Sequence, residues 1–268
     1  MTVTFRQLVA GLRDLGLDGS RPVIAHASLS AFGHVQGGAS TLVGALLATA
    51  QRVMMPTFTY RTMITPRVGP PNNALEYGRR EHANLLAEFY HADMPADPLM
   101  GVTAETLRRL PEAQRSNHPI YSFSGVGVEE GLRQQSVQDP FAPIRWLTEQ
   151  RGFVLLLGVG HTANTSIHYG EQLAGRKQFI RWALTPRGVV ECPHWPGCSR
   201  GFDAISPHVQ EFTRRTQIGQ AEVQLLPLSD LLKVVVRLIA GDPLALLCHQ
   251  PACLRCEAVR KDVASSTG

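Results

Sequence analysis

One segment, residues 158–171 (GVGHTANTSIHYGE), holds most of the side chains in this sequence that are suited to acid–base chemistry. Thr165, His168 and Glu171 follow one another at intervals of three residues, so on a helix His168 shares a face with each of the other two. A carboxylate one turn from a histidine can orient the ring and stabilise its protonated form, as in a general-base pair. The same spacing is equally compatible with a His168 that only packs and hydrogen-bonds near a helix N-terminus.

A second histidine, His26, ends an apolar run and is followed by the small hydroxyl residues Ser28 and Ser30. This pattern suits a site where the backbone approaches a ligand closely, while a single histidine after a strand is more often structural. The sequence has no phosphate-binding Gly-Lys-Ser/Thr motif, no GxGxxG and no Gly-x-Ser-x-Gly, and no cysteine lies near either histidine. These absences disfavour a nucleotide triphosphatase, a Rossmann dehydrogenase and covalent catalysis, and they leave direct transfer between two bound substrates.

The five cysteines form two groups, Cys192-x5-Cys198 and Cys248-x4-Cys253-x2-Cys256. The Cys-x2-Cys pair has the spacing of structural zinc sites. We expect a tetrathiolate of Cys192, Cys198, Cys253 and Cys256, with Cys248 spare. Free buried thiols explain the pattern equally well, and disulfides explain it less well.

The composition is that of a folded protein without a nucleic-acid or membrane partner. Of the 268 residues, 44% are hydrophobic and 18% charged, and the net charge of +4 is spread without a basic run. No segment reaches the ~18 apolar residues that a membrane span requires. The N-terminal residues 1–16 read as an amphipathic helix rather than a signal peptide, and an odd number of cysteines argues against a secreted disulfide framework. We therefore expect a cytoplasmic protein, either a monomer or a homodimer.

Strands and helices alternate along the chain, which favours an α/β fold. Strands are expected at 22–26, 52–55, 152–158 and 222–226, and a hairpin at 178–183 and 189–192. Helices are expected at 5–16, 40–50, 81–91, 101–110, 139–150, 162–174, 206–216 and 228–239. Ser40-Thr41 is the expected cap of the helix at 40–50. Residues 61–80 are rich in Pro, Gly and Asn and predict a long functional loop. We expect one domain over residues 1–268, with a cysteine-stapled subregion at 185–268. Its architecture is a three-layer α/β/α sandwich with a mostly parallel mixed sheet, a loop-rich helical insertion and a C-terminal hairpin and helix region.

Taken in order, several short motifs resemble the aminoglycoside 3-N-acetyltransferase family, antibiotic acetyltransferases that do not have the common GNAT fold. The matching segments are Val23-Ile-Ala-His26-Ala-Ser-Leu-Ser30, Gly33-His-Val-Gln-Gly37-Gly-Ala-Ser-Thr41, Met54-Met-Pro56-Thr57, Pro95-Ala-Asp97-Pro-Leu-Met-Gly101, Arg115-Ser-Asn-His118-Pro-Ile-Tyr-Ser122, Asp139-Pro-Phe and Thr165-Ser-Ile-His168-Tyr-Gly-Glu171. Each is short, but the ordered set is specific and covers residues 5–175 well.

The resemblance implies acetyl transfer from acetyl-coenzyme A to an amine of a polycationic aminoglycoside, usually the 3-amino group of its deoxystreptamine ring. It makes His168 the expected general base, Glu171 its partner, and His26 the active-site histidine after the first strand. The residues expected to flank the coenzyme arm are Ser28, Ser30, Gly37, Gly38, Thr41, Thr57 and Thr165. Histidine suits the base role because it titrates near neutrality.

A polycationic acceptor calls for carboxylates in its pocket, and the candidates are Glu76, Glu81, Asp93, Asp97 and Asp139. Each of these is also explained as an ordinary exposed carboxylate. Two other functions remain open from the sequence. One is an acyl-CoA-dependent N-acyltransferase of a biosynthetic amine. The other is a coenzyme-A-binding protein without turnover, which has no need of an oriented base.

Overall fold

A seven-stranded sheet runs through the middle of the computed structural model, which describes residues 2–78 and 84–266. The strand order is β11 (Arg214–Ile218), β12 (Ala221–Pro227), β8 (Phe153–Leu157), β2 (Val23–Ala27), β4 (Val53–Pro56), β7 (Phe123–Val126) and β6 (Gln114–Arg115). Strand β2 is parallel to both of its neighbours, whereas the other four pairs are antiparallel. The expectation of a mostly parallel sheet is therefore wrong. Short connections such as the turn between β11 and β12 can join only antiparallel strands.

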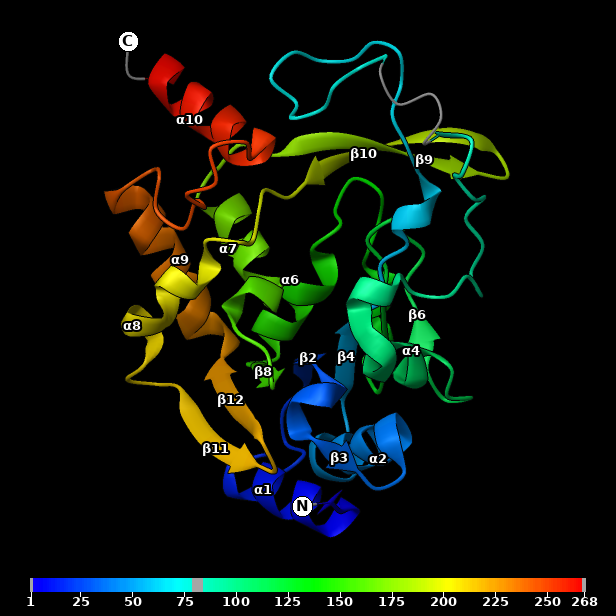
Figure 1. The fold of residues 1–268 in the computed structure, drawn as a ribbon, viewed down its shortest axis with the longest axis vertical. Helices are drawn as coiled ribbons and strands as arrows, with labels where there is room; N and C mark the ends of the chain where they lie inside the picture. Colours follow the sequence, from blue (N-terminus) through cyan, green and yellow to red (C-terminus); the bar gives the residue numbers. More distant parts are fainter. Residues whose placement is uncertain (1, 79–83, 267–268) are drawn as a thin grey trace.

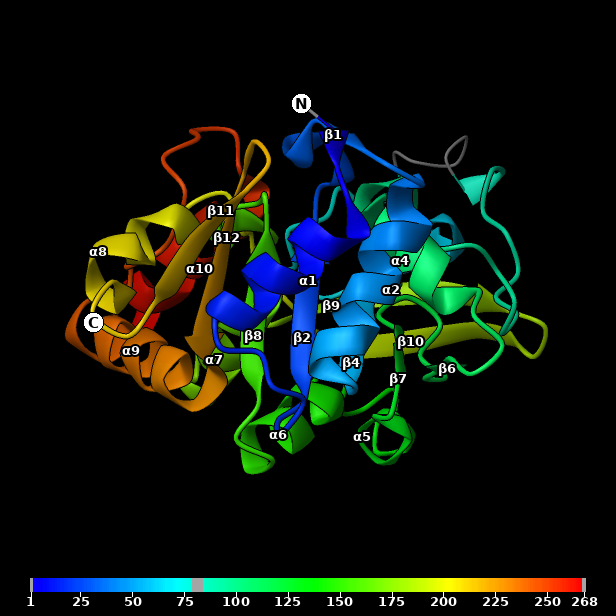
Figure 2. The same cartoon turned by 90° about the horizontal axis from the view of Figure 1, so that it is seen from below.

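The central strands are buried on both faces, and alternate residues enter two separate cores. Ile24, Val154 and Leu156 belong to one core, while Val23 and Leu155 belong to the other. Helices α1 (Phe5–Asp14), α2 (Gly38–Ala50) and α4 (Gly101–Arg108) cover the second face, and Figure 2 shows α1 and α2 lying over β2 and β4. Helices α6 (Ala142–Glu149), α7 (Ser166–Leu173) and α9 (Leu228–Gly241) cover the first.

Smaller elements complete the fold (Figure 1). A second sheet has the order β10 (Gly188–Trp195), β9 (Phe179–Thr185) and β5 (Met63–Ile64), and β1 (Thr2–Val3) pairs with β3 (His34–Val35). Short helices are α5 (Glu129–Arg133) and α8 (Ser206–Val209), with 3₁₀ turns η1 (Leu29–Phe32), η2 (Tyr60–Thr62), η3 (Pro98–Met100), η4 (His161–Ala163) and η5 (Phe202–Ile205). The last helix is α10 (Leu254–Ser266). No helix in the described ranges is long and apolar enough to cross a membrane.

Several expected elements differ from the observed ones. Helix α2 begins after Gly37, whose φ of 77° is left-handed, and not at the expected Ser40-Thr41 cap. The helix expected at 206–216 is wrong: only Ser206–Val209 is helical, and Arg214–Ile218 pairs with β12. Of the helix expected at 81–91, residues 81–83 lie outside the described ranges, and residues 85–91 are turn and irregular chain. Helix α10 was not expected.

Candidate active site

A pocket of ≈ 400 Å³ opens where β2, β4 and β8 end at the edge of the central sheet. Its wall continues through the turn that leads into α7, so that His168 lies in the same pocket as His26. Carboxyl ends of adjacent parallel strands are where open α/β sheets bind ligands. The lining residues are Ala25, His26, Ala27, Met55, Pro56, Phe58, Tyr60, Leu99, Met100, Tyr121, Val159, Thr162, Ala163, Asn164, Thr165, His168 and Ser199.

His168 is joined to a buried chain of charged groups. Its Nδ1 lies 2.7 Å from Oε2 of Glu171, and Oε1 of Glu171 accepts a 2.8 Å hydrogen bond from Nη1 of Arg176. The side chains of Glu171 and Arg176 are 1% and 2% exposed. A buried carboxylate is tolerated when an opposite charge and hydrogen bonds compensate its lost hydration. The pair therefore supplies a fixed acceptor for the His168 ring.

The orientation of His168 leaves one ring nitrogen for chemistry. The ring also packs edge-on against Phe202, with centroids 4.7 Å apart. With Nδ1 donating to the Glu171 carboxylate, the neutral ring carries its lone pair on Nε2. Because His168 lines the pocket, that lone pair can accept a proton from a bound ligand. The expected His168–Glu171 pairing is thus present in the structure.

His26 and His118 are buried histidines held in the neutral form. Burial lowers the pKa of His26 to about 3 and that of His118 to about 4. His26 lines the pocket, and its Nε2 has no hydrogen-bond partner. Nδ1 of His118 accepts hydrogen bonds from the backbone N–H groups of Ile120 and Tyr121, at 3.1 and 2.9 Å, so His118 shapes the turn before β7. Of these two histidines, only His26 lines the pocket.

The residues expected to flank a coenzyme arm divide into three sets. Ser28, Ser30 and Gly38 line a second hollow of ≈ 590 Å³, which shares Ala27, Leu99 and Val159 with the His168 pocket. Gly37 and Thr41 are not among its lining residues, and a Cβ on Gly37 would be 2.3 Å from Oγ1 of Thr41. Thr165 lines the His168 pocket itself. Thr57 is fully buried, bonded to the Ser122 carbonyl and the Ser124 hydroxyl, and lines neither hollow.

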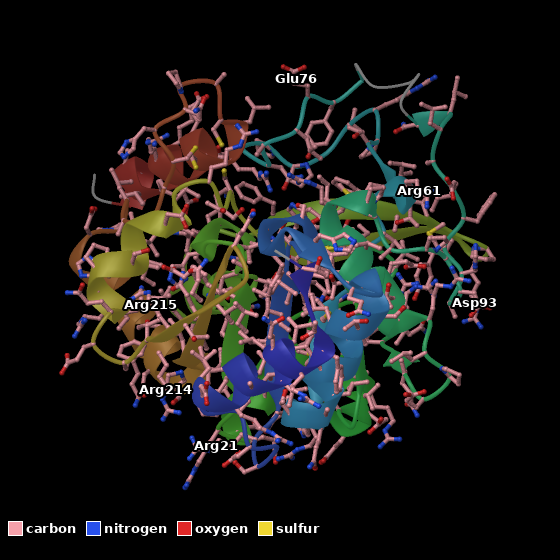
Figure 3. All side chains as sticks on the ribbon, turned by 60° about the horizontal axis from the view of Figure 1, so that its bottom comes forward. Arg21, Arg61, Glu76, Asp93, Arg214 and Arg215 are labelled. Atoms are coloured by element: carbon pink, nitrogen blue, oxygen red, sulfur yellow. The ribbon has the colours of Figure 1, made fainter. Side chains whose placement is uncertain are left out.

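The expected acceptor carboxylates do not meet in one place. Glu76 lines a different hollow beside α10, Asp93 is exposed at another edge of the molecule (Figure 3), and Asp139 pairs with Arg145. Asp97 is beside the pocket: it caps η3, whose Leu99 and Met100 are lining residues. Burial raises the pKa of Tyr60, another lining residue, and the negative charge of Asp97 raises it further. Glu81 lies outside the described residues.

Sequence reasoning missed several groups around the pocket. Arg176 follows Gly175, whose left-handed φ of 72° lets the chain turn back after α7, so that Arg176 reaches Glu171. The sequence signal for this turn was a glycine directly after a predicted helix. Asp203, at the start of η5, accepts from the backbone N–H of the lining residue Thr162 at 3.3 Å. Ser199 and Phe202 come from the segment after β10, and no local pattern connects that segment to α7.

Four cysteines gather beside this site, but they are not the expected four. The Sγ atoms of Cys198, Cys248, Cys253 and Cys256 all lie within 4.8 Å of one another. Cys192 lies in β10 outside this group, and its Sγ is 3.8 Å from the carbonyl of Val190. The fourth member of the group is therefore Cys248 and not the expected Cys192. Cys248 lies in the segment between α9 and α10, which brings its sulfur close to those of Cys253 and Cys256. All five cysteines are free of disulfides.

Sequence comparison identifies relatives of this chain. The profile of the family described as aminoglycoside 3-N-acetyltransferase matches residues 24–240. Aminoglycoside N(3)-acetyltransferase IX of Micromonospora chalcea is 34% identical over 192 residues. That match covers 67% of this chain and 66% of the relative, slightly less than two thirds of the relative's length.

Solved structures share the fold over nearly the whole chain. The apoenzyme of aminoglycoside acetyltransferase AAC(3)-IVa superposes with a TM-score of 0.79 at 24% identity, covering 97% of this chain and 98% of that one. AAC-VIa bound to sisomicin has a TM-score of 0.71 at 22% identity and covers 90% and 98% of the two chains. AAC-IIIb with CoASH has a TM-score of 0.69 at 23% identity and covers 90% and 97%. The seven-stranded mixed sheet flanked by helices is thus a shared architecture.

Proposed function

This chain belongs to the aminoglycoside 3-N-acetyltransferase family, and on that premise we propose that it transfers the acetyl group of acetyl-coenzyme A to an amine, the 3-amino group, of an aminoglycoside. The observation that carries the proposal is the 2.7 Å contact between Nδ1 of His168 and Oε2 of Glu171, on a histidine that also lines a pocket. A ring held in this way is a general base with a fixed direction. Such a reaction confers antibiotic resistance.

The reaction requires one proton to leave the amine as its nitrogen attacks the thioester carbon. Nε2 of His168 takes this proton, while Glu171 accepts from Nδ1 and stabilises the imidazolium. The carbon–sulfur bond then breaks, and the proton on His168 passes to the departing thiolate, which leaves coenzyme A and an amide. Arg176 keeps Glu171 in place through this cycle by its 2.8 Å ion pair.

The oxyanion that forms on the thioester oxygen needs a hydrogen-bond donor. We assign this role to the hydroxyl of Thr165, which lines the pocket and lies one helical turn before His168. His26 is on the same wall and stays neutral, since its pKa is lowered to about 3. Its ring positions a substrate by hydrogen bonding rather than by charge.

Acetyl-coenzyme A is proposed to lie in the hollow next to the His168 pocket. Ser28, Ser30 and Gly38 line that hollow, and Gly37 and Thr41 lie next to Gly38 at the start of α2. The two hollows share lining residues, so a thioester entering from one side reaches His168. The structural relative AAC-IIIb binds CoASH, which supports the assignment.

The acceptor is proposed to enter beside Asp97 and Asp203. Asp97 caps the turn that supplies Leu99 to the pocket, and Asp203 bonds to the lining residue Thr162. Each carboxylate thus accepts a hydrogen bond from a residue that lines the pocket, and both can attract the ammonium groups of an aminoglycoside. The structural relative AAC-VIa binds sisomicin, which supports an acceptor of this class.

A second candidate is an acyl-CoA-dependent N-acyltransferase of a small biosynthetic amine. The observation that favours it is the composition of the pocket wall: among the described residues that line it, none is Asp or Glu. A polycation is expected to meet several carboxylates, and Glu76, Asp93 and Asp139 lie elsewhere. An acceptor with one amine needs fewer of them.

An acetylation screen separates these functions. Purified protein is mixed with acetyl-coenzyme A and either gentamicin, sisomicin or a set of small primary amines, and release of the coenzyme A thiol is followed. Turnover of an aminoglycoside with the product acetylated at its 3-amino group supports the first proposal. Turnover of small amines alone selects the second candidate, and no amine-dependent thiol release with either class rejects both.

We also propose that residues 1–268 act as one acetyltransferase domain. The two cores lie on opposite faces of a single sheet whose strands come from residues 23–227. The described part of residues 185–268, which carries the cysteines, packs against the rest of the chain: α9 contacts α7, and Arg176 bonds to the carbonyls of Pro243 and Ala245.

A further inference from the structure

Four cysteine side chains from three separate segments meet next to the His168 pocket. Cys198 lies between β10 and η5, Cys248 follows α9, and Cys253 and Cys256 lie at the start of α10 (Figure 1). Their sulfurs are all within 4.8 Å of one another, and the Cys248 and Cys256 sulfurs are 3.5 Å apart. Three of the four residues are buried and Cys253 is partly buried.

The arrangement fits a single tetrahedral metal ion. Zinc–sulfur bonds of about 2.3 Å place the sulfurs of a tetrathiolate about 3.8 Å apart, so the observed separations need to change by at most about 1 Å. Disulfides need only two sulfurs in contact, whereas here all four approach each other. An iron–sulfur cluster holds several metal ions and spreads its cysteines farther apart. We propose that Cys198, Cys248, Cys253 and Cys256 bind one zinc ion, and that this ion fastens the wall of the His168 pocket to α10.

The surroundings suit the net charge of −2 that a zinc tetrathiolate carries. Cys253 immediately precedes α10 and Cys256 lies in its first turn, where the partial positive charge of a helix N-terminus favours anions. The backbone N–H of Arg200 points at Sγ of Cys198, at 3.5 Å. Arg260 donates to the carbonyl of Cys248 at 2.7 Å, which places a further positive charge beside the group.

Two of the ligand-bearing segments also contact the proposed catalytic groups. Gly197, before Cys198, lies against Glu171: a Cβ there would be 3.8 Å from Oε2. Ser199, after Cys198, lines the pocket. Arg255, which lies on α10 between the ligands Cys253 and Cys256, donates to the Gly197 carbonyl at 2.9 Å. A metal that joins these segments therefore holds the wall behind Glu171 in place.

The chain before Cys248 makes the second connection. Arg176, the ion-pair partner of Glu171, donates from Nη2 to the carbonyls of Pro243 and Ala245 at 2.8 and 2.7 Å. Cys248 follows three residues after Ala245, so the ion anchors this segment as well. The zinc site and its contacts near Glu171 do not depend on the proposed acetyl transfer, and only their importance for catalysis rests on that function.

Metal analysis of the full chain, purified without a histidine tag, tests the site directly. One zinc per chain is expected, and reconstitution with Co²⁺ should give the visible spectrum of tetrahedral cobalt together with thiolate charge-transfer bands. Cys198→Ser or Cys256→Ser should lose zinc to a chelator that leaves the wild type loaded, while the matched control Cys192→Ala keeps it. Stoichiometric iron, no metal in the wild type, or loss of zinc from a folded Cys192→Ala variant overturns the proposal.

Amide hydrogen exchange of the wild type, with zinc bound and after chelation, tests the link to the pocket. Removal of zinc should speed exchange in residues 196–202 and 243–248, and leave β2 and β8 protected. Unchanged exchange in 196–202 contradicts the fastening role. A protein that binds zinc and shows this exchange pattern, but acetylates no amine, contradicts the proposed function and leaves this inference standing.

Discussion

Glu171 meets Arg176 through the carboxylate oxygen that His168 does not use. Oε1 of Glu171 accepts from Arg176 and Oε2 lies 2.7 Å from the His168 ring. The carboxylate is almost completely buried and has the arginine as its ion-pair partner. Its negative charge is therefore held in place before any substrate binds, which makes Arg176 the residue that positions the base.

Replacement of Arg176 should destabilise the fold and slow catalysis together. Arg176→Ala leaves the buried Glu171 carboxylate without its arginine partner and with only the His168 ring beside it, a change that costs up to about 3–5 kcal/mol. Urea unfolding of the variant at about pH 7.5 measures this loss. The matched control is Arg145→Ala, which breaks the half-exposed pair with Asp139 and should cost less than about 1 kcal/mol. Equal losses in the two variants would contradict the buried-pair interpretation.

Loss of the His168 ring should affect turnover more than binding. His168→Ala is expected to lower kcat by about 10²–10⁴-fold, the range for a missing general base. Coenzyme A affinity, measured by calorimetry, should stay close to that of the wild type, because the coenzyme hollow does not include His168. The exposed His208 provides the control, and His208→Ala should keep full turnover. Retention of more than half of the activity by His168→Ala rules out the base role.

Acidification should weaken the fold through its buried histidines. An unfolded histidine binds a proton near pH 6.5, whereas His26 and His118 do so only near pH 3 and 4 when folded. The unfolded state therefore gains protons first, and stability falls as the pH drops from 6.5 toward 3. At pH 5.5 each histidine should remove about 1.4 kcal/mol relative to pH 7.5.

Denaturant unfolding at these two pH values checks the effect. His26→Leu removes a ring whose Nε2 has no partner, so it should reduce the combined loss from these two histidines by about half. His208→Leu, at an exposed position, should retain the acid sensitivity of the wild type. The same loss in all three proteins would show that His26 is not held neutral.

The acceptor site should depend on Asp97 and Asp203. Asn still caps a turn, so Asp97→Asn and Asp203→Asn remove charge with little change of shape. Each should raise the aminoglycoside KM by up to about 5-fold, the effect of losing one exposed ion pair, with kcat unchanged. Added salt should raise the wild-type KM as well, since it screens exposed charges. Asp93→Asn is the control, and an equal rise there would argue against the assignment.

The sequence predicted those features that depend on neighbouring residues. The apolar run Phe153–Leu157 forms β8, and the three-residue spacing of Thr165, His168 and Glu171 places the base and its partner on α7 as expected. The Thr185–Gly188 turn closes the expected hairpin of β9 and β10. Each of these patterns is read within one element, where periodicity and turn residues act locally.

The remaining features depend on contacts between distant segments. The expected helix 206–216 included the first residues of β11, Arg214–Thr216, whose conformation is determined by pairing with β12 rather than by local propensity. Cys248 joins three other cysteines only once α9 and α10 have packed, so spacing alone favoured Cys192. The same kind of packing brings Asp203 to the backbone N–H of the lining residue Thr162, 41 residues earlier in the chain.

The two backbone carbonyls that accept hydrogen bonds from Arg176 also limit how far the C-terminus of this protein can be truncated. The match to the family profile ends at residue 240, yet Pro243 and Ala245 lie beyond it, and their carbonyls bind Arg176, the partner of Glu171. An expression fragment trimmed to the matched span would keep every proposed catalytic side chain and lose the backbone that supports them. Residues 243–256 therefore support the candidate active site. A chimera with another family member should exchange residues 166–176 and 243–256 together.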